Sequence, residues 1–543
     1  MALMELSPSA HADTFCRDRL PPFDHWPELL FELPELTYPE RLNCARVLLD
    51  DVIERFGPDR RCLLTPTDEW TYGELLHRAR QVAQVLTEDL GLVPGNRVLL
   101  RGPNNPWLVA CWFGILRAGG VVVTTMPLLR AHELSTLCAI SRPAVAITDH
   151  RFADELEAAD AGKAAVISYG GTSADDLVAR CAGKTGDFTA VDTAADDVAL
   201  IGFTSGTTGK PKATMHFHRD VLANSDTFAR HIVKPRPDDL FTGTPPIGFT
   251  FGLGGLVVFP LHVGAATLLL EQVTPEQLAG LIAAHGATVL FTAPTAYRAI
   301  LSSGLADRMS GLRRCVSAGE ALPASVWDAF HAETGLRIID GIGATEMLHV
   351  FISAADDDIR PGATGKPVPG FRAEVLDEAG HAVADGEPGL LAVKGPTGCR
   401  YLDDARQTQY VRHGWNITGD TYVRDADGYF WYQARSDDMI VSSGYNIAGP
   451  EVEVALAKHP DVAECGVVGA PDERRGKIVK AYVVLRQGVA PDDAKAGELQ
   501  TFVKETVAPY KYPRAVEFVD ALPRTSNGKL QRAVLRRWAA EGR

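Results

Sequence analysis

The sequence predicts an α/β protein built from more than one domain. Its 543 residues are more than a single hydrophobic core usually holds. Segments with helical periodicity alternate with short, β-branched apolar runs, which is typical of βα units around buried, largely parallel sheets. Near residues 380–389 this pattern changes to shorter strands separated by Gly, Asp and Pro turns. We therefore expect a large N-terminal domain of two βα-layered sheets plus a barrel-like antiparallel subdomain, followed by a small α+β C-terminal domain.

The elements of the large domain follow one another in a regular order. Residues 1–45 are rich in proline and aromatic side chains and are expected to wrap the body as an extended arm. Helical periodicity predicts helices at 75–86 and 106–116. Apolar runs predict strands at 97–100, 120–123, 144–148, 164–168, 288–292, 314–317, 390–393 and 428–432.

The C-terminal part has the size and pattern of one compact domain. Its predicted elements are helices at 451–459 and 498–507, strands at 464–468 and 478–485, and a terminal helix ending near Trp538. We place the boundary between residues 434 and 435, so that the two domains span 1–434 and 435–543.

Composition and charge argue against several classes of protein. The net charge of −15, from 54 Lys and Arg against 69 Asp and Glu, argues against a nucleic-acid binder. Nine cysteines without a CxxC pair indicate reduced thiols in a cytoplasmic protein, and residues 1–24 show no signal peptide. Residues 240–270 contain no Asp, Glu, Lys or Arg, but three prolines and six glycines interrupt them. We therefore expect buried core segments there rather than a membrane span.

One segment, residues 204–212, carries the clearest sign of chemistry. It reads Thr204-Ser205-Gly206-Thr207-Thr208-Gly209-Lys210-Pro211-Lys212. Glycines bring backbone N–H groups close to an anion, and hydroxyl and ammonium groups add donors, so this composition predicts a loop that holds nucleotide phosphates. It is not the GxxxxGK[ST] P-loop, because no glycine precedes Gly209-Lys210 at that spacing. On composition alone, an ordinary surface loop is the alternative.

The order of these nine residues resembles the phosphate loop of the adenylate-forming superfamily, which comprises acyl- and aryl-CoA ligases, peptide-synthetase adenylation domains and luciferases. Further segments match in the same order as far as Lys529, so the resemblance covers essentially the whole chain. Residues 341–346 resemble the superfamily's Gly-x-Thr-Glu motif. The resemblance implies nucleotide contacts from Asp340, Gly341, Ile342 and Gly343, an α-phosphate bond from Thr345, and an Mg²⁺ ligand in Glu346. Ile342 stands where the family has an aromatic residue that packs on adenine, so the stacking surface must be aliphatic or come from elsewhere.

The other matching segments imply the rest of a nucleotide site and a moving domain. Residues 317–323 imply that Gly319 and Glu320 lie near adenine, and residues 418–420 imply that Asp420 accepts the ribose hydroxyls. Residues 435–440 imply that Arg435 contacts ribose or phosphate and that Asp437 is the hinge, while Gly444 would line a pantetheine tunnel. Residues 523–529 imply that Lys529 is the catalytic lysine. Taken singly, these segments are ordinary turns, linkers or surface lysines. Their shared order carries the resemblance.

The resemblance implies an ATP-dependent aryl-acid:CoA ligase. The residues that would hold the β- and γ-phosphates of ATP are Thr204, Ser205, Thr207, Thr208 and Lys212, in a loop shaped by Gly206 and Gly209. Lys529 would bind the α-phosphate and the incoming carboxylate, in a reaction where positioning and electrostatics supply most of the catalysis. Rotation about Asp437 would then admit the thiol of coenzyme A.

The acyl pocket is expected at Thr250, Phe251 and Gly252, with His349 following the magnesium motif. These segments look most like those of benzoate- and 2-aminobenzoate-CoA ligases. Thr250-Phe251 replaces the Ala-Tyr pair of benzoate ligases, which favours a ring with a small polar substituent, such as 2-aminobenzoate. Phe251 would offer a flat apolar wall to that ring. His349 would face the substituent or the carboxylate, and a satisfied structural histidine is the alternative.

Three other functions are compatible with parts of the sequence. A stand-alone adenylation enzyme would load the aryl group onto a separate carrier protein, and these motifs do not reveal the acceptor. A luciferase-like oxygenase would use the same scaffold, although no sequence feature requires it. A non-catalytic nucleotide-binding protein is disfavoured by the joint presence of Glu346, Asp420 and Lys529. Homodimerisation is implied by the family alone.

Overall fold

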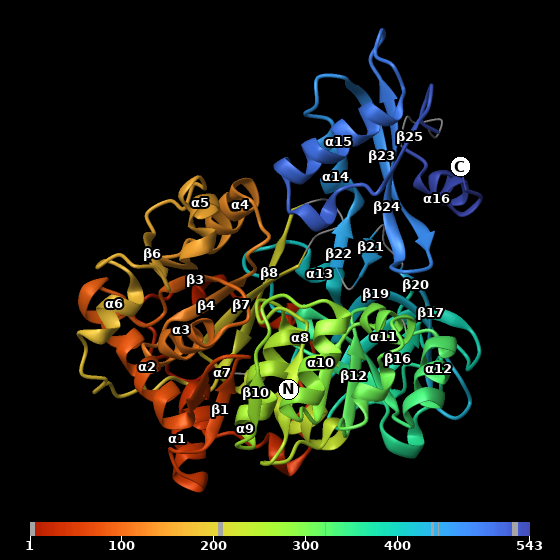
Figure 1. The fold of residues 1–543 in the computed structure, drawn as a ribbon. Helices are drawn as coiled ribbons and strands as arrows, with labels where there is room; N and C mark the ends of the chain where they lie inside the picture. Colours follow the sequence, from red (N-terminus) through yellow and green to blue (C-terminus); the bar gives the residue numbers. More distant parts are fainter. Residues whose placement is uncertain are drawn as a thin grey trace.

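The computed structural model describes residues 6–204, 210–320, 322–435, 439–443, 445–523 and 530–542 (Figure 1). In these residues the strands form five sheets: two large sheets, a smaller antiparallel sheet, a hairpin and a three-stranded sheet. The predicted α/β fold, with its antiparallel subdomain and its small C-terminal α+β part, is confirmed. We call residues 439–542 the C-terminal lobe and the preceding residues the large lobe.

The first large sheet has the strand order β6-β5-β3-β4-β7-β8. Its strands are β3 (Arg97–Arg101), β4 (Val121–Thr125), β5 (Val145–Asp149), β6 (Ala165–Tyr169), β7 (Val198–Thr204) and β8 (Lys212–Phe217). All neighbours pair in parallel except β8, which runs antiparallel to β7 at the edge. Strand β3 is buried along its whole length, as expected of an apolar strand covered on both faces.

The second large sheet has nine strands in the order β15-β14-β13-β12-β11-β9-β10-β1-β2. They are β1 (Arg61–Leu64), β2 (Glu69–Thr71), β9 (Leu240–Gly243), β10 (Ala266–Leu268), β11 (Val289–Thr292), β12 (Arg314–Ala318), β13 (Ile338–Gly343), β14 (Val350–Ser353) and β15 (Lys366–Pro367). The six central strands are parallel, and β2, β14 and β15 add antiparallel edges.

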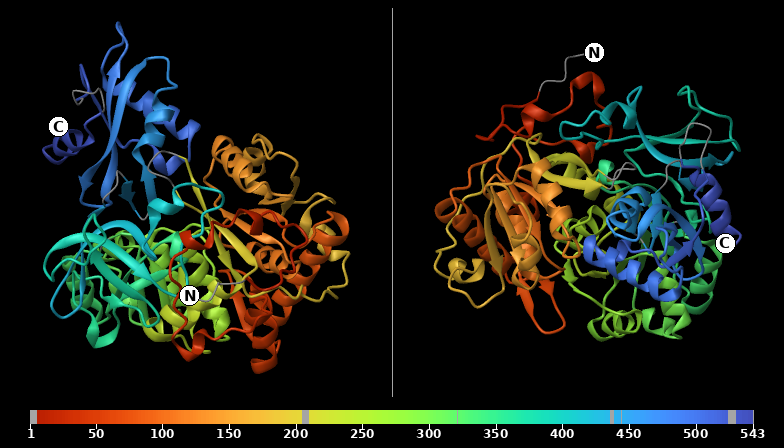
Figure 2. Two further views of the ribbon diagram at one scale, coloured as in Figure 1. Left: turned by 180° about the vertical axis from the view of Figure 1, so that it is seen from behind. Right: turned by 90° about the horizontal axis from the view of Figure 1, so that it is seen from above.

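The antiparallel sheet follows where the turn-rich sequence predicts it. It consists of β16 (Arg372–Leu376), β17 (Pro388–Lys394), β18 (Val411–Arg412), β19 (Trp415–Arg424) and β20 (Phe430–Arg435). The N-terminal arm lies beside this sheet (Figure 2), where Leu29 forms a bridge with Gly395. The arm therefore packs on the body, as its composition predicts.

The C-terminal lobe stands on the large lobe in Figures 1 and 2. Its strands are the hairpin β21 (Met439–Ser442) and β22 (Tyr445–Ala448), and the sheet of β23 (Val462–Asp472), β24 (Gly476–Leu485) and β25 (Ala515–Phe518). The predicted boundary at residue 435 coincides with the end of β20. It stays a prediction, because residues 436–438 lie outside the described part of the chain.

Helices cover both large sheets and the C-terminal sheet (Figure 1). Those of the large lobe are α1 (Cys44–Phe56), α2 (Tyr72–Gln84), α3 (Pro106–Arg117), α4 (Ala131–Ser141), α5 (Ala153–Glu157), α6 (Leu177–Ala182), α7 (His218–Asn224), α8 (Thr250–Leu253), α9 (Phe259–His262), α10 (Pro275–His285), α11 (Pro294–Ser302), α12 (Ala324–Thr334) and α13 (Gln407–Tyr410). Those of the C-terminal lobe are α14 (Gly449–Leu456), α15 (Asp493–Thr506) and α16 (Arg532–Ala540).

Local sequence signals explain where the predicted helices begin. Helix α3 begins at Pro106, after Asn105 accepts the Leu108 N–H as its cap, so prediction and structure agree there. Helix α2 begins three residues before its predicted start, because Thr71 and Glu74 form a capping box that apolar periodicity alone does not reveal.

The charge-free stretch from residue 240 to 270 lies inside the large lobe. It forms β9, α8, a π-helical segment at Gly254–Val258, α9 and β10, and most of its apolar side chains are buried. The interpretation of this stretch as core segments is confirmed. Within the described ranges, no helix is long and apolar enough to cross a membrane.

Candidate active site

Three predicted motifs meet where strand β7 ends. A Cβ atom on Gly202 would lie 2.7 Å from Cγ2 of Thr345 and 4.0 Å from Cγ2 of Thr250, so Gly202 lets both threonines approach the strand. Thr204 and Lys212 are paired residues of β7 and β8, which return the chain to the same place after the phosphate segment. Residues far apart in sequence therefore form one site.

Glu346 and Lys212 lie at the centre of this site. Glu346, in a short 3₁₀ turn (Thr345–Met347), is 6% exposed, and its Oε1 lies 3.5 Å from Nζ of Lys212. The Tyr401 hydroxyl donates to the same Oε1 at 2.5 Å. The Lys212 ammonium also lies over the rings of Tyr401 and Tyr410, at 5.0 and 5.6 Å. The carboxylate is held in one orientation by a hydroxyl and a cation.

A buried polar network supports the backbone beside Glu346. Nε2 of His216, on β8, donates to the carbonyl of Thr345 at 2.7 Å. Burial lowers the pKa of His216 to about 4, so the ring is neutral near pH 7. Behind it, Arg400 donates to Asp220 at 2.7 Å, and all three side chains are fully buried. This network keeps the 3₁₀ turn close to β8.

The predicted adenine segments lie on adjacent strands of the nine-stranded sheet. Asp340 and Gly341 on β13 pair with Ser317 and Ala318 on β12, and Gly319 and Glu320 follow directly after β12. The Ser353 hydroxyl donates to the carbonyl of Asp340 at 2.5 Å.

Two glycines in these segments have structural reasons. Gly319 has a φ of +91°, which favours glycine. A Cβ on Gly343 would lie 2.7 Å from the carbonyl oxygen of His349. The adjacent Ile342 is half-buried and packs against the main core, which leaves an aliphatic side chain at the family's aromatic position.

The predicted ribose residue lies near the same strands. Asp420 on β19 is 6% exposed, and in the β19–β20 ladder its backbone lies opposite that of Arg435. The buried Tyr422 connects this region to Asp340. Burial raises the pKa of the Tyr422 phenol, and the charges of Asp420 and Asp340 raise it further. The predicted adenine and ribose carboxylates therefore flank one tyrosine.

The buried carboxyl of Asp340 makes the stability of the protein depend on pH. Burial raises the pKa of its carboxyl from the ordinary value to about 8. Because the folded-state pKa lies above that of the unfolded chain, the contribution of Asp340 to stability is present below about pH 4 and is lost as the pH rises towards 8. The difference in free energy of unfolding between the Asp340→Asn variant and wild type should therefore favour the variant more at pH 9 than at pH 4, by at least ~1 kcal/mol. Urea unfolding at both values measures this, and a pH-independent difference contradicts it.

The predicted acyl pocket is an aromatic cluster. The ring of His349 lies 5.5 Å from that of Phe251, 4.6 Å from Phe259, 5.2 Å from Phe228 and 6.5 Å from Phe291. The structure thus brings Phe251 and His349 together, as predicted. It also adds three phenylalanines that the sequence analysis did not select, because ordinary core residues have the same composition.

Two glycines allow this cluster to form. A Cβ on Gly252 would lie 2.2 Å from the carbonyl oxygen of Pro246, and one on Gly254 would lie 2.4 Å from Cδ2 of His349. Backbone at these positions therefore packs more closely than any other residue permits. The histidine ring lies directly against the helical segment that carries Thr250 and Phe251.

The hydrogen bonding of His349 is incomplete. Its Nε2 donates to the carbonyl of Phe251 at 3.4 Å, while its buried Nδ1 has no hydrogen-bond partner among the described residues. Burial lowers the pKa of His349 to about 3, so the ring stays neutral and Nδ1 carries a free lone pair. An unpaired buried acceptor is costly, and a donor group on a ligand would satisfy it.

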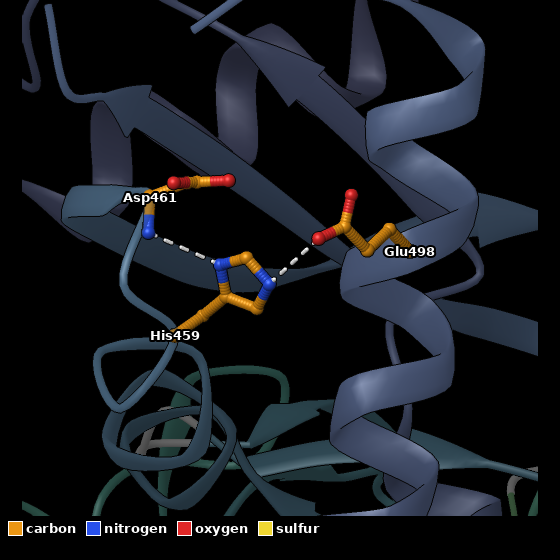
Figure 3. Close-up of side chains that lie close together, drawn as sticks. All are labelled: His459, Asp461 and Glu498. Atoms are coloured by element: carbon orange, nitrogen blue, oxygen red, sulfur yellow. Dashed lines mark hydrogen bonds and ion pairs between the residues drawn. The ribbon is translucent and has the colours of Figure 1, made fainter.

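A second polar cluster lies in the C-terminal lobe (Figure 3). His459, Asp461 and Glu498 are close enough to hold a metal ion. However, both ring nitrogens of His459 are engaged, Nδ1 by the Asp461 N–H and Nε2 by Glu498, each at 3.2 Å. The Lys495 ammonium bridges Asp461 and Glu498 at 2.6 Å each. Lysine thus already supplies the positive charge, and this cluster is an ion-pair network.

Several predicted site residues cannot be placed. Those outside the described residues are Ser205, Gly206, Thr207, Thr208, Gly209, Asp437, Gly444 and Lys529. Conversely, the sequence motifs did not indicate Tyr401, His216 or Arg400 as site residues. No local signal marks Tyr401, because its partner Glu346 lies 55 residues away in sequence.

Comparisons with known proteins agree with this geometry. The family model described as "AMP-binding enzyme" matches residues 49–400, and its C-terminal domain model matches residues 451–529. A benzoate–CoA ligase from Thauera aromatica is 35% identical over 93% of this chain and 97% of its own.

Two solved structures are also similar. The anthranilate CoA ligase AuaEII, in complex with anthranoyl-AMP, has a TM-score of 0.72 at 33% identity, covering 93% of this chain and 99% of its own. The amide bond synthetase McbA from Marinactinospora thermotolerans has a TM-score of 0.82 at 28% identity, covering 92% and 100%. This chain belongs to the AMP-binding enzymes of the adenylate-forming superfamily.

Proposed function

We propose that this enzyme is an AMP-forming acid–thiol ligase that converts an aromatic carboxylate, ATP and coenzyme A into an aryl-CoA thioester. One observation carries the proposal. Five consecutive residues, 345–349, connect the Lys212–Glu346 ion pair to the aromatic cluster around His349. A charged pair suited to binding phosphate and Mg²⁺ and an aromatic cluster suited to an aryl ring therefore lie close together, as a reaction between ATP and an aryl acid would require.

The first half-reaction would join the substrate carboxylate to the α-phosphorus of ATP, with release of pyrophosphate. Negative charge gathers on the phosphate oxygens in this step, so a positioned cation stabilises it. Lys212 would contact the terminal phosphates, and Lys529 would neutralise the α-phosphate. Asp340 and Asp420 would hold the adenine and ribose ends.

Glu346 fits a role as magnesium ligand. Its carboxylate is a hard oxygen donor of the kind that Mg²⁺ prefers. The buried hydroxyl of Thr204 has no hydrogen-bond partner among the described residues and would supply a second oxygen. Bound Mg²⁺ would neutralise charge on the phosphates. The Tyr401 hydroxyl would keep the Glu346 carboxylate in place.

In the second half-reaction the thiolate sulfur of coenzyme A would attack the carbonyl carbon of the aryl-adenylate, and AMP would leave. We place Arg435 on the ribose or phosphate, Asp437 at the hinge and Gly444 in the pantetheine tunnel, as their motif positions imply. This step requires a second arrangement of the lobes, because Lys529 must make room for the thiol.

We propose 2-aminobenzoate, or another benzoate with an ortho hydrogen-bond donor, as the acid. Support comes from the buried Nδ1 of His349, which accepts but cannot donate while Nε2–H bonds to Phe251. Plain benzoate would leave this acceptor unsatisfied.

Replacing His349 by phenylalanine tests this specificity. The variant keeps an aromatic ring but loses the acceptor, so the preference for 2-aminobenzoate over benzoate in kcat/KM should fall by about 10-fold or more. Benzoate is the internal control, since its own kcat/KM should not fall in the same proportion. A variant that loses activity equally on both acids contradicts the assignment of the acceptor.

Mass spectrometry of the products, after incubation with ATP, Mg²⁺, coenzyme A and a mixture of aryl and fatty acids, tests the function as a whole. A dominant aryl-CoA supports the proposal. Adenylate and pyrophosphate without thioester indicate a carrier protein as the acceptor. The higher structural similarity to an amide bond synthetase makes an amine the other acceptor to include, and amide formation in preference to thioester would overturn the ligase assignment.

A further inference from the structure

A buried ion pair joins the C-terminal lobe to the large lobe. The ammonium of Lys511, in a 3₁₀ turn (Pro509–Lys511), lies 2.6 Å from Oε1 of Glu133 at the start of α4. It also lies 2.7 Å from Glu451 of α14, within its own lobe. Glu133 and Lys511 are 7% and 6% exposed, although nearly all charged side chains of this kind lie at protein surfaces.

The contact is more than a single pair of charges. Oε2 of Glu133 accepts the backbone N–H of Ala508 at 3.0 Å, so the large lobe binds both the side chain and the backbone of this segment. Burial by itself lowers the pKa of Lys511, but Tyr510, Glu133 and Glu451 raise it above its ordinary value, so the residue is charged. A charged lysine at this depth depends on its two carboxylates.

The same segment is connected to the predicted acyl pocket. The ring of Tyr510 stacks on that of Tyr445 at 4.2 Å, with an interplanar angle of 25°. Tyr445, which begins β22, in turn meets Phe249 of the large lobe at 6.3 Å. Phe249 occupies the N-cap position of α8 and directly precedes Thr250 and Phe251, the residues of the predicted acyl pocket. The ion pair and the aromatic contact therefore hold the hairpin β21–β22 at the edge of this pocket.

We propose that Glu133 and Lys511 are positioning residues that hold the lobes in the arrangement used for attack of the thiol on the aryl-adenylate, an inference that rests on the proposed function. On the proposed mechanism, the adenylation step uses a different arrangement of the lobes, reached by rotation of the C-terminal lobe. The buried pair between Glu133 and Lys511 thus opens and closes once in each catalytic cycle. Together with the other contacts between the lobes, such as that of Arg130 with the carbonyl of Lys504, its strength contributes to the fraction of enzyme with the hairpin at the pocket.

Glu133→Gln is the most selective test. Glu133 also accepts the N–H of Arg130 in the capping box of α4, and glutamine serves equally in that position, so the helix start is preserved. Thioester formation from a supplied aryl-adenylate and coenzyme A should slow by about 10-fold or more, because the productive arrangement becomes less populated. Adenylation, followed by ATP–pyrophosphate exchange, should stay within about 3-fold of wild type or become faster.

Glu517→Gln is the matched control. Glu517 of β25 pairs with Lys480 of β24 at 2.7 Å, in a lysine–glutamate pair that lies within the C-terminal lobe. This variant should leave both half-reactions unchanged. Equal loss of both steps in Glu133→Gln, or no loss of the thioester step, would overturn the proposal.

Small-angle X-ray scattering supplies a readout without turnover. Glu133→Gln and Lys511→Met should broaden the distribution of interatomic distances, whereas Glu517→Gln should superimpose on wild type. Unchanged scattering in both interface variants overturns the proposal even where activity falls. If wild type forms no adenylate from any acid, the proposed function fails, while the scattering result still decides whether this pair holds the lobes.

Discussion

Lys529→Ala is expected to slow aryl-adenylate formation by at least ~100-fold, because a preorganised cation at the α-phosphate stabilises charge that develops only in the transition state. Conversion of a supplied aryl-adenylate to the thioester should stay within about 3-fold of wild type, since the proposed mechanism removes this lysine from the site before the thiol attacks. ATP–pyrophosphate exchange measures the first step, and mass spectrometry of aryl-CoA measures the second.

Lys458→Ala is the control for this prediction. Lys458 is exposed in the C-terminal lobe, so its loss changes the charge of the lobe by the same amount without affecting the proposed site. Both half-reactions should match wild type. Equal loss of both steps in Lys529→Ala would sink the assigned role.

Glu346→Gln is expected to produce the second large effect, a loss of about 100-fold in adenylation. The change removes the charge proposed to bind Mg²⁺ and leaves Lys212 and the Tyr401 hydroxyl without their ionic partner. The Mg²⁺ concentration for half-maximal adenylation should rise together with the loss in rate. Initial rates measured across a magnesium titration test both statements.

Two further variants separate the role of the Glu346 charge from that of its hydrogen bond and from a general effect of losing a carboxylate. Tyr401→Phe should lower adenylation by about 10-fold, because it removes one hydrogen bond to a charged group and keeps the carboxylate. Glu333→Gln, at an exposed position of α12, should change nothing. A Glu346→Gln enzyme with an unchanged magnesium dependence contradicts the ligand role, whatever its rate.

The sequence predicted the architecture because its signals are local. Apolar runs located β3, β5, β11 and β12 to within about one residue, and helical periodicity located the start of α3 at Pro106. The ordered motifs identified the family, which the comparisons confirm. The predicted start of helix α2 was three residues too late, because apolar periodicity does not detect a capping box.

The sequence by itself therefore determined the fold class, the family and the set of nucleotide-site candidates, since each depends on residue order over short distances. Only the tertiary structure decided what surrounds them. The Tyr401 hydroxyl reaches Glu346, Phe228 and Phe259 enclose His349, and Lys511 meets Glu133 across 378 residues of sequence. These contacts arise where separate sheets and lobes pack together, and no local pattern of residues specifies which partners that packing brings within reach.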